Sequence, residues 1–319
     1  MFERRGLIIH PHELTETWIQ RLPDLGINVL GLHPVGGADA DQTLGALVDM
    51  MRDSTFQKKL DKVRALEIQV EFEVHALSYL MPRSLFADHP NWFHMDKKGD
   101  RVADFNLCAS DLGALQYLKH SAARLAEALP SDSHRYYFWL DDLKDGACHC
   151  PMCRSLSPSD QQMICLNTML HGIREVDSQA KLAFLSYCDT LTPPTVVKPE
   201  DGIFMEFAPF QRRLDRPMCD SDCPENAMHL EKLKESMAFF GTEDAQILEY
   251  WLDNSMFSGW HYPPQPIKLN DRIIKDDVQF YRSLGFRSIT TFACYLGDDY
   301  EHLYGRPDLS AYAKAFDDR

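Results

Sequence analysis

The residues Gly6-Leu7-Ile8-Ile9-His10-Pro11-His12 separate the two folds that fit this sequence best. The apolar run at their start predicts a strand that is buried on both faces, as in a parallel sheet. A doubly wound, nucleotide-binding sheet would carry a glycine-rich phosphate turn directly after this strand. His10-Pro11-His12 has no such glycines, so the first strand favours a closed barrel over an open sheet.

Seven further strand patterns follow, and helical patterns separate nearly all of them. The expected strands are Gly6–His12, Ile27–His33, Ile68–His75, Arg135–Asp141, Lys181–Tyr187, Gly202–Ala208, Gln246–Trp251 and Ser288–Tyr295. The expected helices cover 14–25, 41–66, 111–129, 159–176, 225–240 and 269–284. Eight strands in 319 residues predict the α/β class, with a single (β/α)8 TIM barrel over 1–319 whose βα loops are enlarged.

Composition excludes several classes of partner. Lys and Arg number 33 against 48 Asp and Glu, which gives a formal net charge of -15. Such an acidic surface repels nucleic acid and anionic membranes. No apolar run approaches the roughly 20 residues of a membrane span, and the first residues lack the apolar core of a signal peptide. We therefore expect a cytoplasmic protein with neither a nucleic-acid nor a membrane partner, and no pattern sets its oligomeric state.

In a barrel, side chains alternate between the helix layer and the axis, and reactive groups gather at the carboxyl ends of the strands. If the most apolar positions face the helices, acids, imidazoles and indoles face the axis. That inward set is His10, His12, His33, Glu71, Glu73, His75, Tyr137, Trp139, Asp141, Glu206, Glu249 and Trp251, with Asp142 at the following turn. So many chemically active groups at one end favour a functional site.

Two chemistries fit that set. His10-x-His12 resembles the start of metal-dependent amidohydrolases, but Leu185-Ser186-Tyr187 and Glu206-Phe207-Ala208 replace the histidines that such enzymes carry after strands five and six. A metal-dependent sugar hydrolase or isomerase using His10, His12, Glu73 and His75 thus stays an alternative.

Glycoside hydrolysis is the preferred chemistry, since it needs paired carboxylates and aromatic platforms for sugar faces. The acids are Asp141, Asp142, Glu206 and Glu249, and the platforms are Tyr137, Trp139, Tyr187, Tyr250, Trp251 and Tyr295. A non-catalytic glycan-binding barrel is a third alternative.

Three cysteines follow the proposed acids as Cys148-x-Cys150-x-x-Cys153. Thiolates at this spacing can bind zinc, with Cys223 as the expected fourth ligand and Cys219 or His149 as alternatives. Such a site would be structural, because four ligands leave no open position for substrate. The competing interpretation is a set of reduced loop thiols. No cofactor is expected for catalysis.

Several segments together resemble a known family. Arg5–Ile9 and Gly26–His33 look like the first two strands of family 20 hexosaminidases. The segments that follow are similar to domain-of-unknown-function family 4838, which includes glycoside hydrolase family 163. They are His89-Pro90-Asn91-Trp92-Phe93, Trp139-Leu140-Asp141-Asp142, Cys148-His149-Cys150-Pro151-Met152-Cys153 and Phe207-Ala208-Pro209-Phe210.

This resemblance implies a β-N-acetylglucosaminidase-like enzyme that acts on small or imported glycans, with a retaining mechanism assisted by the substrate's acetamide. Asp141 would orient the acetamide and Asp142 would be the general acid, where the relatives have Glu. Arg5, His33 and His75 would line the pocket. Glu249 is the alternative acid, since Tyr250 and Trp251 would desolvate it and raise its pKa.

Overall fold

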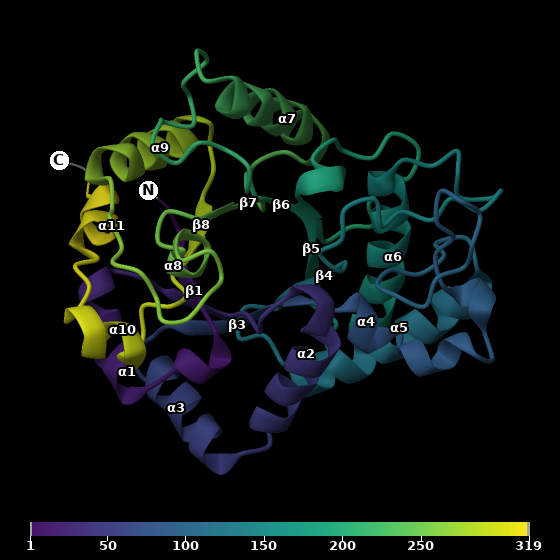
Figure 1. The fold of residues 1–319 in the computed structure, drawn as a ribbon, viewed down its shortest axis with the longest axis horizontal. Coiled ribbons are helices and arrows are strands. Elements are labelled where there is room, and N and C mark those ends of the chain that lie inside the picture. The colour runs from purple at the N-terminus through teal and green to yellow at the C-terminus, as the bar shows by residue number, and fades with distance from the viewer. Residues whose placement is uncertain (1, 318–319) are drawn as a thin grey trace. The chain divides into compact units, whose positions relative to one another are not determined.

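The computed structural model describes residues 2–317 and contains a closed barrel of eight parallel strands in the order β1 to β8 (Figure 1). The predicted fold class is therefore confirmed. The strands are β1 Arg4–Ile9, β2 Val29–Leu32, β3 Gln69–His75, β4 Arg135–Trp139, β5 Lys181–Ser186, β6 Ile203–Phe207, β7 Gln246–Glu249 and β8 Ser288–Phe292.

Helices follow the strands, as the sequence pattern predicts. They are α1 Glu16–Arg21, α2 Ala40–Met50, α3 Ser54–Arg64, α4 Leu77–Leu80, α5 Leu112–Ala128, α6 Pro158–Ile173, α7 Pro224–Phe240, α8 Asn254–Phe257, α9 Asp271–Ser283, α10 Asp298–Tyr304 and α11 Ser310–Ala315. The helix expected over 41–66 is two helices. The amides of Arg52 and Asp53 bond to carbonyls three residues back, a tighter turn that ends α2 before Ser54 starts α3.

Contacts divide the chain into two compact units. The first unit consists of Met1–His33, Thr55–Val70 and Met205–Arg319, and the second consists of Pro34–Ser54 and Glu71–Phe204. Each unit is described by itself below. A single domain over 1–319 stays a prediction.

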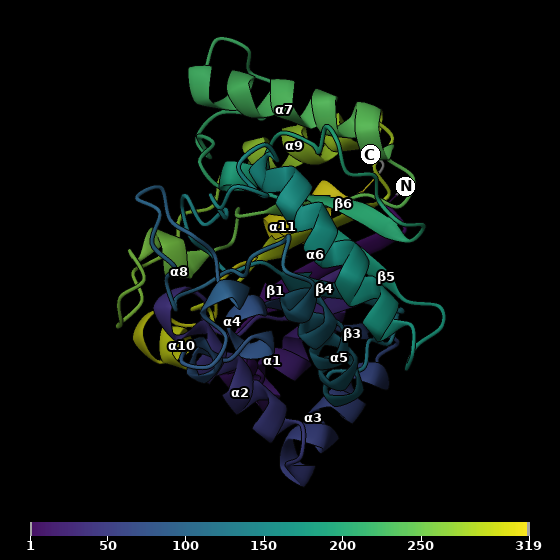
Figure 2. The same cartoon turned by 90° about the vertical axis from the view of Figure 1, so that its right-hand side faces the viewer.

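In the second unit, α5 and α6 lie side by side against β4 and β5 (Figure 2). Ser157 caps α6 by accepting the amide of Asp160, as expected from the sequence. The helices approach so closely that a Cβ on Gly172 would lie 2.0 Å from the Lys119 carbonyl oxygen. Glycine is therefore required at this crossing.

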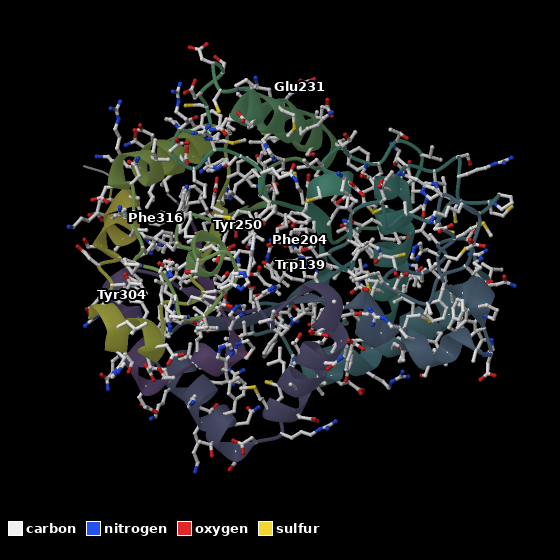
Figure 3. The ribbon with its side chains drawn as sticks, viewed as in Figure 1. Trp139, Phe204, Glu231, Tyr250, Tyr304 and Phe316 are labelled. Carbon is white, nitrogen blue, oxygen red and sulfur yellow. The ribbon has the colours of Figure 1, made fainter. Side chains whose placement is uncertain are left out.

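In the second unit, the side chains of β4 alternate between the inside of the barrel and the helix layer, as predicted. Arg135 Nε donates to the Tyr137 hydroxyl at 3.1 Å, and the Arg135 guanidinium lies over the Phe204 ring of β6. Tyr136, on the opposite face, donates to Asp177 beyond α6. Figure 3 marks Trp139 and Phe204, which belong to β4 and β6. Odd-numbered residues of β4 therefore face inward.

The first unit has its own inward-facing network. Gln246 Nε2 on β7 donates to Glu206 Oε1 on β6 at 2.8 Å, and Ser288 on β8 donates to Gln246 Oε1. Glu206 therefore faces inward, as predicted. Because Gln246 faces inward too, Leu248 shares its face and Glu249 lies on the opposite one.

Candidate functional site

The second unit holds a pocket at the carboxyl ends of β3, β4 and β5. It encloses about 680 Å³ of space, part of which is continuous with solvent. Its lining includes four of the predicted site residues: His75, Asp141, Asp142 and Tyr187. These residues follow three different strands, which explains why the sequence spreads them over more than a hundred positions. The predicted acid pair and two predicted substrate-binding residues thus meet in one place.

Asp141 is buried at this pocket and is held by one carboxylate oxygen. Oδ1 accepts the amide of Ser78 at 3.2 Å and its hydroxyl at 3.1 Å. Oδ2 is equally buried and has no hydrogen-bond partner within residues 2–317. Burial raises the pKa of Asp141, while the Ser78 bonds and the nearby His75 oppose that rise. The second oxygen is therefore an unsatisfied buried acceptor in a residue that lines the pocket.

Asp142 is exposed and lies beside Tyr187. Burial and then the Asp142 charge raise the pKa of Tyr187, so its hydroxyl stays protonated and can donate. Two adjacent carboxyls thus have different environments: one is buried and anchored, and its neighbour is solvated at the pocket mouth.

His75 and Trp139 are neighbouring aromatic residues at the carboxyl ends of β3 and β4. Their rings meet edge to face at 5.2 Å, and His75 Nδ1 contacts the Leu140 carbonyl oxygen at 2.7 Å. A carbonyl can only accept, so Nδ1 donates to it and this bond fixes the orientation of the imidazole. His75 is therefore held in one orientation at the wall of the pocket.

The first unit brings other predicted residues together at the carboxyl ends of its strands. The rings of His33 and Tyr250 both pack on Phe292, at 5.1 and 5.4 Å. Tyr295 packs on Tyr262 with ring centres 4.1 Å apart. His33, Tyr250 and Tyr295 thus lie among aromatic rings at the ends of β2, β7 and β8, and their substrate-binding role stays a prediction.

The orientation predicted for Glu249 is wrong. Its carboxylate points to the helix layer, where it lies 3.1 Å from Arg212 Nε and accepts the hydroxyl of Tyr281 on α9. Arg212 also pairs with Asp277 on α9, and the side chains of Arg212 and Glu249 are fully buried. Burial raises the pKa of Glu249, but the group is enclosed by its partners. Glu249 is therefore a structural ion-pair partner and a poor candidate for the general acid.

Two predicted substrate-binding residues are also placed elsewhere. Trp251 Nε1 donates to Asp277 at 3.0 Å, so its ring belongs to the same ion-pair network. Arg5 lies at the amino end of β1, at the opposite end of the strand from the site, and its guanidinium lies over the Phe316 ring. Apolar patterning could not reveal these partners, because all of them come from distant segments.

His10 and His12, which the metal-dependent alternative also uses, belong to the first unit and lie near the end of β1. His10 and His12 stack with ring centres 5.5 Å apart, and His10 Nδ1 lies 2.7 Å from the His33 carbonyl oxygen. Burial lowers the pKa of His10 to about 4. Within the described residues, His10 lies close to Glu13 and Cys294 rather than in a His10–His12 chelate. Both oxygens of Glu13 already accept amides, from His10 and Tyr295, which suits a structural role.

Four cysteines form the densest cluster of candidate metal ligands. Cys108 joins Cys148, Cys150 and Cys153, and their four buried sulfurs lie within 4.8 Å of one another. Cys223 was the expected fourth ligand, and that expectation is wrong: it precedes α7, where its thiol contacts Glu225 at 3.4 Å. The sequence could not single out Cys108, since the chain contains several other unassigned cysteines at unrelated spacings.

The cluster has the dimensions of a tetrahedral metal site. Zinc–sulfur bonds of about 2.3 Å place the sulfurs of such a site roughly 3.8 Å apart. Cys108 Sγ lies 3.7 Å from Cys150 Sγ and 3.9 Å from Cys153 Sγ. The Met95 amide points at Cys148 Sγ at 3.3 Å, a contact that stabilises thiolate charge. The four-cysteine cluster can therefore hold a structural metal.

Fold and site define the class of protein: a (β/α)8 barrel with adjacent acids at the carboxyl ends of its strands. The chain belongs to the family described as "Domain of unknown function (DUF4838)", whose pattern matches residues 48–299. The predicted membership of family 4838 is thereby confirmed, and the relation to glycoside hydrolase family 163 stays a prediction. No curated protein matches the chain in sequence.

Several solved glycoside hydrolases share the barrel. The catalytic domain of an endoglucanase from Thermobifida fusca has a TM-score of 0.51 at 12% identity, over 94% of this chain and 81% of its own. A Rhizomucor miehei chitinase has a TM-score of 0.51 at 8% identity, over 98% and 100%. A β-galactosidase from the psychrophilic Marinomonas ef1 has 0.50 at 10% identity, over 91% and 53%. This chain thus spans about half of that galactosidase, and identities this low show the fold alone.

Proposed function

We propose that the protein is a glycoside hydrolase of the β-N-acetylglucosaminidase type, and that it retains anomeric configuration through substrate assistance. One observation carries the proposal: the adjacent acids Asp141 and Asp142 line one pocket, and the buried Oδ2 of Asp141 has no partner in the described part of the chain. The barrel shared with an endoglucanase and a chitinase is consistent with it.

The two acids would divide the work between them. Asp141 Oδ2 accepts the N–H of the sugar's acetamide and aims the acetamide oxygen at the anomeric carbon. That oxygen forms a bond to the carbon as the glycosidic bond breaks, and Asp142 gives its proton to the departing oxygen. Asp142 then takes a proton from water, which opens the cyclic intermediate. His75 and Tyr187, which line the same pocket, would bind sugar hydroxyls.

The finer assignments belong to the same proposal. The metal of the four-cysteine cluster is zinc, because four soft thiolates in tetrahedral array favour it. The proposed substrates are short glycans that reach the cytoplasm. No helix in the described range is long and apolar enough to cross a membrane.

A panel of nitrophenyl glycosides tests the proposal. We expect release from the β-N-acetylglucosaminide and none from the β-glucoside or β-glucuronide, because only the first carries an acetamide. Addition of a mild chelator should not change the initial rate. Release from all three sugars would contradict substrate assistance, and inhibition by the chelator while the four-cysteine cluster keeps its metal would favour the metal-dependent alternative. A protein that binds these sugars without cleaving them would be a glycan-binding barrel.

The pH profile of Ser78→Ala offers a separate check on Asp141. Asp141 acts ionised, so activity falls as pH drops through its raised pKa. The Ser78 hydroxyl donates to the charged form and lowers that pKa. Its removal should move the acid limb of kcat/KM to higher pH and leave the alkaline limb in place. An unmoved acid limb would contradict the role given to Asp141. Ser84→Ala, at an exposed serine in the same segment between β3 and α5, is the matched control.

A further inference from the structure

The four-cysteine cluster lies directly behind the wall of the pocket. Leu107 and Ala109 line the pocket on either side of Cys108, and Ala147 lines it next to Cys148. The cluster therefore joins two connections that build the pocket. One is the segment between β3 and α5, called the β3–α5 segment below, and the other is the loop between β4 and α6. Both loops contain little regular structure.

Asn106 connects the cluster to the acids. It is buried two residues before Cys108, and its Oδ1 accepts the amide of Asp141 at 3.1 Å. Its Nδ2 donates to the Gly146 carbonyl oxygen at 3.3 Å. A Cβ on Gly146 would lie 2.6 Å from that same Nδ2. Asn106 is thus fitted closely between the two loops and fixes the backbone that carries the acid pair.

A second link runs through α6. The Cys148 amide donates to Gln161 Oε1 at 2.8 Å, and Gln161 Nε2 returns a bond to the Cys148 carbonyl oxygen at 3.0 Å. Gln161 also lines the pocket. The β3–α5 segment itself is paired only locally: isolated bridges join Phe93 to Leu107 and Met95 to Arg101, and one backbone bond, from the His149 amide to the Met95 carbonyl oxygen, reaches the other loop. A segment built from short helices and isolated bridges opens at lower cost than the barrel strands unless something else closes it.

We propose that a metal bound by Cys108, Cys148, Cys150 and Cys153 is the clamp that holds Asn106 against the Asp141 backbone, so that metal loading sets the position of the acid pair. Metal binding would supply the free energy that orders the two loops. Asn106 is a positioning residue in this arrangement. The inference rests on the proposed function only in taking this pocket as the active one.

The test measures metal content and backbone protection, neither of which needs turnover. Protein purified without chelator should contain about one zinc per chain. Cys108→Ser should lose that zinc, and hydrogen exchange in 93–110 and 141–148 should accelerate by about tenfold or more. Cys223→Ser, at a buried cysteine outside the cluster, is the control and should match the wild type in both readouts.

The contrary results are equally definite. Wild-type protein without metal, or Cys108→Ser with full metal, would overturn the site. Metal-free protein with wild-type protection at 141–148 would overturn the clamp. If Cys108→Ser does not fold, zinc is stripped from the wild type with a chelator and a reversible thiol reagent, and exchange is followed before and after zinc is restored. Asn106→Ala should keep the zinc yet lose protection at 141–148. All of these readouts remain measurable if the protein hydrolyses no glycoside, so the two proposals fail separately.

Discussion

Asp142→Asn is expected to lower kcat on an N-acetylglucosaminide with a poor leaving group by about 10²–10⁴-fold, the usual contribution of a general acid. An amide cannot give a proton to the departing oxygen. The defect should shrink with a dinitrophenyl leaving group, which departs without protonation. Asp141→Asn should lose activity on both substrates, because the acetamide is no longer oriented.

Comparing the two leaving groups therefore separates the two roles. Equal defects for Asp142→Asn on both substrates would contradict its assignment as the acid. Asp145→Asn is the matched control: this exposed carboxylate lies in the same loop and pairs with Lys97, away from the pocket lining. Its rates should stay at the wild-type level.

Arg212→Met is expected to cause the largest loss of stability, about 3–5 kcal/mol in the free energy of unfolding. The change removes the only positive charge that the described contacts place between Glu249 and Asp277, and both carboxylates stay buried. Burial raises the folded-state pKa of both, and the loss of Arg212 raises them further. Since a raised acid pKa costs stability as pH rises, the deficit should grow with pH.

Urea unfolding at several pH values measures this loss. Arg213→Ala is the control, because Arg213 pairs with Asp215 at the exposed surface and should matter little. A variant with wild-type stability would mean that the ion pairs contribute nothing. A deficit that stays constant with pH would mean that the carboxylates titrate normally.

The barrel could be predicted well because each strand is recognisable from a short apolar run and the residues that flank it. Leu7-Ile8-Ile9, for example, is bounded by Gly6 and His10, and every strand was found with its ends displaced by at most a few positions. The acid pair was found for the same reason, since it directly follows the fourth strand.

The errors came from contacts between distant segments. Glu249 points to the helix layer, where Arg212 and Tyr281 bind it. The residues of Gln246–Trp251 alone do not indicate either partner. Cys108 joins the cysteine triplet only because the β3–α5 segment folds back on the loop after β4. Ser78 and Asn106, which hold Asp141, belong to no pattern that chemistry requires at a fixed spacing.

Substrate assistance is the central claim, and a series of nitrophenyl glucosaminides with progressively fluorinated acetamides tests it most directly. Fluorine withdraws electrons from the acetamide oxygen and weakens it as the attacking group, while the leaving group stays the same. We predict that kcat falls steeply from acetyl to trifluoroacetyl, in proportion to the lost nucleophilicity. A kcat that is independent of fluorination would show that a protein carboxylate attacks instead, and would contradict the roles given to Asp141 and Asp142.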